Sequence, residues 1–164
     1  MKLATHYIFS AGLISLVLSF ISKLSFPYIF LISFFVSFVG NRVIDGLGHE
    51  MVSGWNKLYP RRTPLTHTIP RSVLWGIAVV APLLFIIYFF GELRFFFPVL
   101  IAGVIVGPSH MILDIFTEAG IYVKKNGKWK RIALAHFAYN DPFVNSISSV
   151  LGLLMLFFAF SLHN

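Results

Sequence analysis

The sequence predicts an all-α protein, a polytopic bundle of about five transmembrane helices that forms one membrane-embedded domain over residues 1–164. Three observations predict this class. Hydrophobic residues make up 57% of the 164 positions and charged residues 12%, whereas about a quarter of a typical soluble domain is charged. The mean hydropathy is +0.83. The apolar residues also gather in runs, and about 20 apolar residues are enough to cross a bilayer.

The runs are separated by short polar segments, and each is expected to form one span. The second run is short for a span, so it either extends into residues 41–44 or leaves a bundle of four helices. The expected spans cover residues 5–22, 27–40, 72–91, 95–116 and 143–162.

The polar segments 41–71 and 118–141 hold most of the basic residues. The chain carries 13 Lys and Arg against 6 Asp and Glu, a net charge of +7. Two spans separate these segments, and two more separate the first from the amino terminus, so all three lie on one side of the membrane. The positive-inside rule makes this side cytoplasmic in a protein integral to the cell membrane. In the second segment, Asn126-Gly127 predicts a short β-hairpin.

The basic surface has two readings. Nucleic-acid binding would suit it, but no recognition motif is present, so we favour orientation in the membrane and contact with anionic lipid. There are no cysteines. A metal ion would therefore need ligands from His, Asp, Glu or backbone oxygen.

His110 and Asp114 are four residues apart in an apolar run, which places them on one face of a helix. An imidazole and a carboxylate are good ligands for a hard or borderline cation. The alternative is a buried pair joined by a hydrogen bond. Asp45 precedes His49 by the same interval, and it could instead cap a helix or pair with Arg42.

Five of the six histidines fall on the basic side in this topology. Ionisable groups at membrane depth are costly and usually functional, so their convergence favours a site. The expected metal ligands are His6, Asp45, His67, His110 and Asp114. Three further residues are candidate general bases: His49, Glu118 and His136. Of these, His49 and His136 also fit as ordinary loop residues. Arg61 and Arg62 would stabilise phosphate charge, or they simply follow the positive-inside rule.

Two segments resemble a known family. Residues 61–68 read RRTPLTHT, and residues 109–120 read SHMILDIFTEAG. Together they resemble small membrane-bound, metal-dependent hydrolases described as LexA-binding and inner-membrane-associated, in an archaeal branch. That family is related to the zinc-dependent phospholipase C and single-strand nucleases, helical enzymes whose His and Asp ligands hold zinc and cleave phosphodiesters. The family's Pro-Asp-x-Asp-His element is reduced here to Asp45 with His49 further on, so one or two zinc ions are expected.

The leading hypothesis is a membrane-embedded, metal-dependent hydrolase of phosphoesters, with membrane lipid headgroups as a plausible substrate. The alternative is a non-enzymatic membrane protein in which the His and Asp residues form a structural metal site or a polar lock. In that case the basic face would bind anionic lipid or a partner. A metal or proton transporter is disfavoured because the middles of the spans are expected to lack polar residues.

Overall fold

The computed structural model describes residues 1–53 and 58–164, with the backbone alone described for residues 58–60. Five helices are each long and apolar enough to cross a membrane, which confirms the predicted all-α class. A short 3₁₀ turn, η1 (Leu93–Phe95), precedes the fourth helix. The helices are α1 (Leu3–Ile21), α2 (Phe26–Leu47), α3 (Ile69–Phe89), α4 (Phe96–Asp114) and α5 (Pro142–Ser161).

Three of the helices begin where the sequence supplies a proline in the first turn. An N–H in the first turn has no partner within the helix, so proline loses no hydrogen bond there, and its φ angle is already helical. Two of these starts also have a side-chain cap. The Thr68 side chain accepts a hydrogen bond from the Arg71 amide, and Asp141 accepts one from the Val144 amide.

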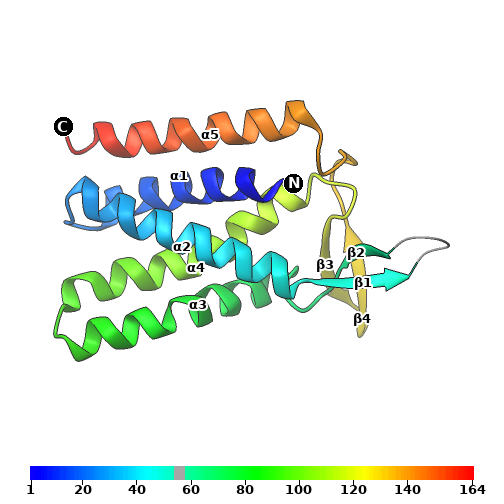
Figure 1. Cartoon of the computed structure of the whole chain (residues 1–164), viewed down its shortest axis with the longest axis horizontal. Coiled ribbons are helices and arrows are strands. Elements are labelled where there is room, and N and C mark those ends of the chain that lie inside the picture. The colour runs from blue at the N-terminus through cyan, green and yellow to red at the C-terminus, as the bar shows by residue number, and fades with distance from the viewer. Residues whose placement is uncertain (54–57) are drawn as a thin grey trace.

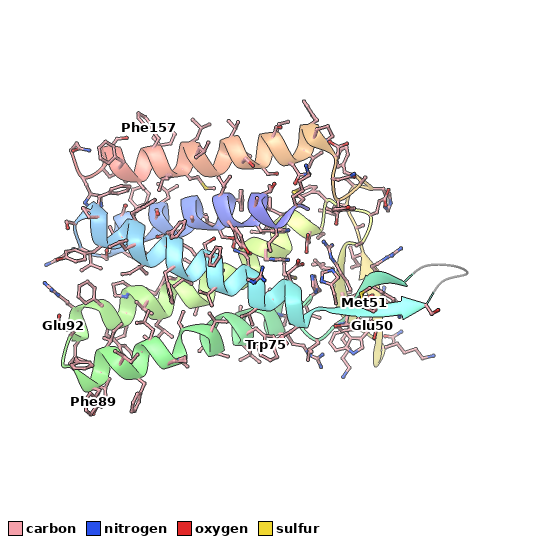
Figure 2. The ribbon with its side chains drawn as sticks, viewed as in Figure 1. Glu50, Met51, Trp75, Phe89, Glu92 and Phe157 are labelled. Carbon is pink, nitrogen blue, oxygen red and sulfur yellow. The ribbon has the colours of Figure 1, made fainter. Side chains whose placement is uncertain are left out.

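The helices form one bundle in which α1 contacts α5 and α2, while α4 contacts α3, α2 and α1. The core is built from buried aliphatic residues such as Ile14, Leu18 and Val36. The outer surface is also apolar, and Figure 2 shows Phe89 and Phe157 on the outside of the bundle, where they are 72% and 62% exposed. An apolar exterior suits a protein whose solvent is lipid.

Two β-hairpins lie at one end of the bundle, here called the hairpin end (Figure 1). The first pairs β1 (His49–Ser53) with β2 (Leu58–Arg62), and the second pairs β3 (Ile121–Lys125) with β4 (Lys128–Ile132). The amino terminus lies at this end and the carboxy terminus at the other, as the expected topology requires.

The second hairpin was predicted and is confirmed. Its turn residues Asn126 and Gly127 have φ angles of 52° and 76°, the left-handed conformation that a two-residue hairpin turn needs. The first hairpin was not predicted, because the sequence of residues 49–62 contains no Asn-Gly pair.

The second span does extend through residues 41–44, one of the two outcomes left open by its length, and it continues to Leu47. The polar residues that follow residue 40 find partners inside the bundle. Asn41, for example, donates from Nδ2 to the Ser37 carbonyl oxygen at 2.8 Å. The expectation that the middles of the spans lack polar residues is wrong, since Ser10 and Ser37 are buried near the middles of α1 and α2. Their hydroxyls are short and hydrogen-bonded within the bundle.

Because α1 and α5 are in close contact, adding one methyl group at Gly12 should destabilise the bundle. A Cβ at Gly12 would meet the backbone carbonyl of Gly152, whereas a Cβ at Gly46 would meet nothing within 4 Å. We expect Gly12→Ala to lower the free energy of unfolding by about 1–3 kcal/mol through overpacking. Gly46→Ala should be neutral or slightly stabilising. Thermal unfolding of both variants in detergent measures this, and equal melting temperatures would contradict the assigned helix contact.

Candidate metal centre

The site is built around the Asp114 carboxylate, which is completely buried at the carboxyl end of α4. Its Oδ2 lies 3.1 Å from His110 Nε2 and 3.5 Å from His67 Nε2. Its Oδ1 lies 3.3 Å from His6 Nε2. All three histidines are also fully or almost fully buried. Residues from α1, from α4 and from the segment before α3 therefore direct ring nitrogens at one carboxylate.

The hydrogen bond of His110 determines which of its nitrogens is free. His110 Nδ1 lies 2.9 Å from Asn41 Oδ1, and the amide group of Asn41 donates from Nδ2 to Ser37. A carboxamide oxygen only accepts, so His110 Nδ1 carries the proton and donates it. In the neutral ring, Nε2 then presents a lone pair toward Asp114.

His67 is held in the same way by its sequence neighbour. The Thr66 hydroxyl donates its single proton to the Ile44 carbonyl oxygen at 2.8 Å, so it accepts from His67 Nδ1 at 3.0 Å. Burial lowers the pKa of His67 to about 2, although the nearby Asp114 carboxylate acts to raise it. The ring is therefore neutral at physiological pH, with a bare Nε2.

His49 and Asp45 lie beside this group, nearer the surface. His49 Nδ1 lies 2.7 Å from the Asp45 carbonyl oxygen and 3.5 Å from Asp45 Oδ1. Because a carbonyl oxygen only accepts, Nδ1 again carries the proton and Nε2 is free. Asp45 Oδ1 is also 3.9 Å from His110 Nε2. The possible ligands form two adjoining groups, and within each group the ligand atoms lie within 4.8 Å of one another. The groups are His6, His110 and Asp114, and Asp45, His49 and His67.

Arg62 fixes the other side of the central carboxylate. Its Nη2 donates to Asp114 Oδ1 at 2.6 Å, while Nη1 donates to Thr117 Oγ1 and the Gly120 carbonyl oxygen. The Met1 amino group also lies 3.0 Å from Oδ1, and burial lowers its pKa. Both groups contact Oδ1, so Oδ2 remains directed at His67 and His110.

The donor set fits a divalent cation. Asp114 Oδ2 and the Nε2 atoms of His6, His67 and His110 are all buried and have no hydrogen-bond partner among the described residues. Bare imidazole nitrogens that face a carboxylate oxygen repel it unless a cation lies between them. Protons would be poor substitutes, because Arg62 already supplies a positive charge to this carboxylate. Histidines whose Nδ1–H is held by an oxygen acceptor are typical metal ligands.

Local backbone structure brings the segments together. A Cβ at Gly48 would collide with Thr66 Oγ1 and with the His67 ring, so glycine allows α2 to end directly against this pair. The register of β1 and β2 places His49 opposite Arg62. Strand β3 closes the site through the Tyr122 amide, which donates to the His67 carbonyl oxygen at 2.8 Å.

A cavity of about 1180 Å³ opens beside the two groups at the hairpin end. Asp45, His49 and Arg62 belong to both the cavity wall and the site. Aromatic side chains of Tyr122, Trp129 and Tyr139 also line it. Its charged lining is mainly basic and comprises Lys2, Arg61, Arg62 and Arg131 against Asp45 and Glu118.

The structure places the ten candidate residues at different depths. The five expected metal ligands come together, and His49 and Arg62 join them through the contacts described above. Arg61 and Glu118 are exposed in the cavity wall, and Arg61 pairs with Glu50 at 3.5 Å. His136 is exposed in the connection between β4 and α5 and is not among the residues that line the cavity.

Sequence reasoning missed Asn41 and Thr66, the two residues that orient His110 and His67. A signal for Asn41 exists, because it is an amide that follows an apolar run and precedes Asp45 by one helical turn. Thr66 adjoins a candidate ligand, but nothing in the sequence shows that its hydroxyl is shared between Ile44 and His67.

Comparison with known protein families gives a match over most of the chain. The family described as "Protein of unknown function (DUF1286)" matches residues 1–113. The chain belongs to the DUF1286 family. The matched segment covers α1 to α3 and α4 up to the residue before Asp114, so it includes every candidate residue except those from Asp114 onward. No curated protein and no solved structure matches the chain.

The depressed pKa of His67 predicts a pH dependence of stability. The unfolded ring binds a proton below about pH 6.5, whereas the folded ring does not until about pH 2. Acid therefore favours unfolding in this window. Between pH 7 and pH 5 the metal-free protein should lose about 2 kcal/mol relative to His67→Gln, which cannot titrate. Thermal unfolding of both proteins in a chelator measures the difference, and parallel pH profiles would exclude a neutral buried His67.

Proposed function

We propose that this protein is a membrane-embedded, metal-dependent hydrolase that acts on phosphoesters, including lipid headgroups. The single observation that carries the proposal is the set of buried, unpartnered ligand atoms around Asp114. A lock made of hydrogen bonds would pair these atoms with one another. Here the Nδ1 protons of His67 and His110 point away from the carboxylate, which leaves the Nε2 lone pairs of these two rings facing Asp114 Oδ2.

Each of the two adjoining groups would hold one divalent ion when occupied, so the site would bind one or two ions. Imidazole and carboxylate ligands without thiolates are typical of catalytic zinc sites, so zinc is the ion we expect. Such an ion supplies Lewis acidity toward a phosphoryl oxygen and lowers the pKa of water. The partly exposed pair Asp45 and His49 faces the cavity, and this leaves access to the site that a closed structural metal site lacks.

The remaining residues have roles that follow from their positions. The excess of basic side chains in the cavity wall would attract a phosphate group, and a guanidinium fork suits its oxygens. Arg62 reaches both the cavity and Asp114, so it would connect a bound phosphate to the ligand shell. Glu118, exposed in the same wall, is the carboxylate available to accept a proton from an attacking water.

The location of the cavity favours a lipid substrate. It lies at the hairpin end, where α2 and α4 finish and α1, α3 and α5 begin (Figure 1), so it is close to the level of the headgroups. The basic side chains of both hairpin segments make this the cytoplasmic side by the positive-inside rule. The resemblance to membrane-bound metal-dependent hydrolases in residues 61–68 and 109–120 supports the same chemistry.

Metal content is the first test. We expect purified wild-type protein to contain one or two zinc ions per chain, and His110→Ala and Asp114→Ala to lose them because each removes a central ligand. His163→Ala, at the opposite end of the chain, is the matched control and should retain the metal. Elemental analysis after size-exclusion chromatography measures the ratio.

Activity is then measured as headgroup release from phosphatidylglycerol vesicles and as cleavage of bis-p-nitrophenyl phosphate. Zinc bound without turnover of either compound would favour a structural site. A wild-type protein free of metal after incubation with zinc and with manganese would overturn the hydrolase and leave the polar lock.

Asn41 provides a test of how the ligands are oriented. Asn41→Ala removes the acceptor for His110 Nδ1 without touching a ligand atom, so the affinity for zinc should fall about 10–100-fold while the helices remain folded. Ser33→Ala is the control, because Ser33 is also buried on α2 but donates only to its own helix at the Ile29 carbonyl. Competition with a fluorescent chelator measures both affinities. Equal affinities would show that the hydrogen bond from His110 to Asn41 does not orient a metal ligand.

A further inference from the structure

A second cavity lies at the end of the bundle opposite the hairpins. It encloses about 550 Å³ between the turn that joins α1 to α2 and the start of α4. Figure 2 shows Glu92, from the neighbouring α3–α4 turn, at this end, far from Glu50 and Met51. The cavity is therefore separate from the candidate metal centre, and the proposed hydrolase does not use it.

The two basic side chains in the turns of this end line the cavity. Lys23 and Arg94 are the basic side chains of the two turns at this end in the part of the chain that the structure describes, and both line the cavity. By the positive-inside rule, the end opposite the basic hairpins is the one where cations are depleted. Two cations that line the same small space repel each other, and an anion between them would relieve the repulsion.

Contacts around Arg94 hold its guanidinium group at the cavity. The group lies 4.6 Å from the centre of the Phe95 ring and 5.8 Å from that of Tyr28, within the range of cation–π interactions. Glu92 accepts from Arg94 Nε at 3.2 Å but does not line the cavity. The lining itself therefore carries a positive excess.

The rest of the lining is amphipathic. Ser22 lines the cavity, and its Oγ is buried without a hydrogen-bond partner among the described residues. Phe97 and Ile101, one helical turn apart on α4, provide an apolar wall that runs away from the cations along the spanning helix. A soluble anion would leave that wall without a partner.

We propose that this cavity binds one anionic phospholipid of the leaflet opposite the hairpins. Its phosphate would lie between Lys23 and Arg94, with Ser22 as a further donor, and an acyl chain would lie against Phe97 and Ile101. The ends of the spanning helices are the level at which headgroups lie, so the position of the cavity agrees with its chemistry.

Native mass spectrometry of the detergent-purified protein tests the proposal. We expect one phosphatidylglycerol to bind more tightly than the others, and the double variant Lys23→Gln/Arg94→Gln to weaken this binding about tenfold or more, because two charge-assisted contacts are lost. The control Lys125→Gln/Lys128→Gln removes the same charge from the β3–β4 hairpin and should leave the tight site intact. Phe97→Ser tests the acyl wall without changing any charge, and it should also weaken binding.

Three further results would overturn the proposal. Equal binding of phosphatidylglycerol to the wild type and to Lys23→Gln/Arg94→Gln would show that the cations do not hold the headgroup. Equal binding of zwitterionic phosphatidylcholine would remove the need for an anion. Competition by millimolar inorganic phosphate, with no effect of Phe97→Ser, would make the ligand a free anion rather than a lipid.

Discussion

The charge of Asp114 is the constraint on which the hairpin end of this structure depends. A carboxylate that is fully buried at the end of a spanning helix loses its hydration, and that loss must be offset by charge or by hydrogen bonds. The structure does this unequally for the two oxygens. Arg62 and the Met1 amino group contact Oδ1, while Oδ2 faces imidazole nitrogens that have no proton to donate. A site arranged in this way could hold a cation beside Oδ2.

Several features that look unrelated serve this arrangement. Asn41 extends α2 beyond the apolar run and orients His110. Gly48 ends the helix against Thr66, which orients His67. The β1–β2 hairpin carries Arg62 back over the helix ends, and β3 binds to the backbone of His67. The two hairpins are too small to be stable alone, so the polar contacts of the site and the ends of the helices hold them in place.

The two ends of the bundle use basic residues in different ways. At the hairpin end they are numerous, they surround a large cavity and they lie next to possible metal ligands. At the other end Lys23 and Arg94 converge on a smaller cavity whose wall continues along α4. Both arrangements would bind phosphate, but only the first places it beside groups that can hold a metal ion. The chemistry that we propose is therefore confined to one side of the membrane.

The sequence alone determined the class of the fold, the five spans, the β3–β4 turn and the five candidate residues that converge in the structure. These follow from local properties: hydropathy over about 20 residues, the φ preference of Asn-Gly and a four-residue spacing on a helix. The tertiary structure decided what depends on contacts distant in sequence. It extended α2 to Leu47, because Asn41 and Asp45 find partners within the bundle. It separated His136 from the site. It also selected the free nitrogen of His110 through Asn41, and that of His67 through the contact of Thr66 with Ile44. A hydrogen-bond partner on another helix, such as Asn41 for His110, fixes the state of a ring without leaving a local pattern. Sequence spacing could therefore predict candidate ligands that converge, but not the orientation of their rings.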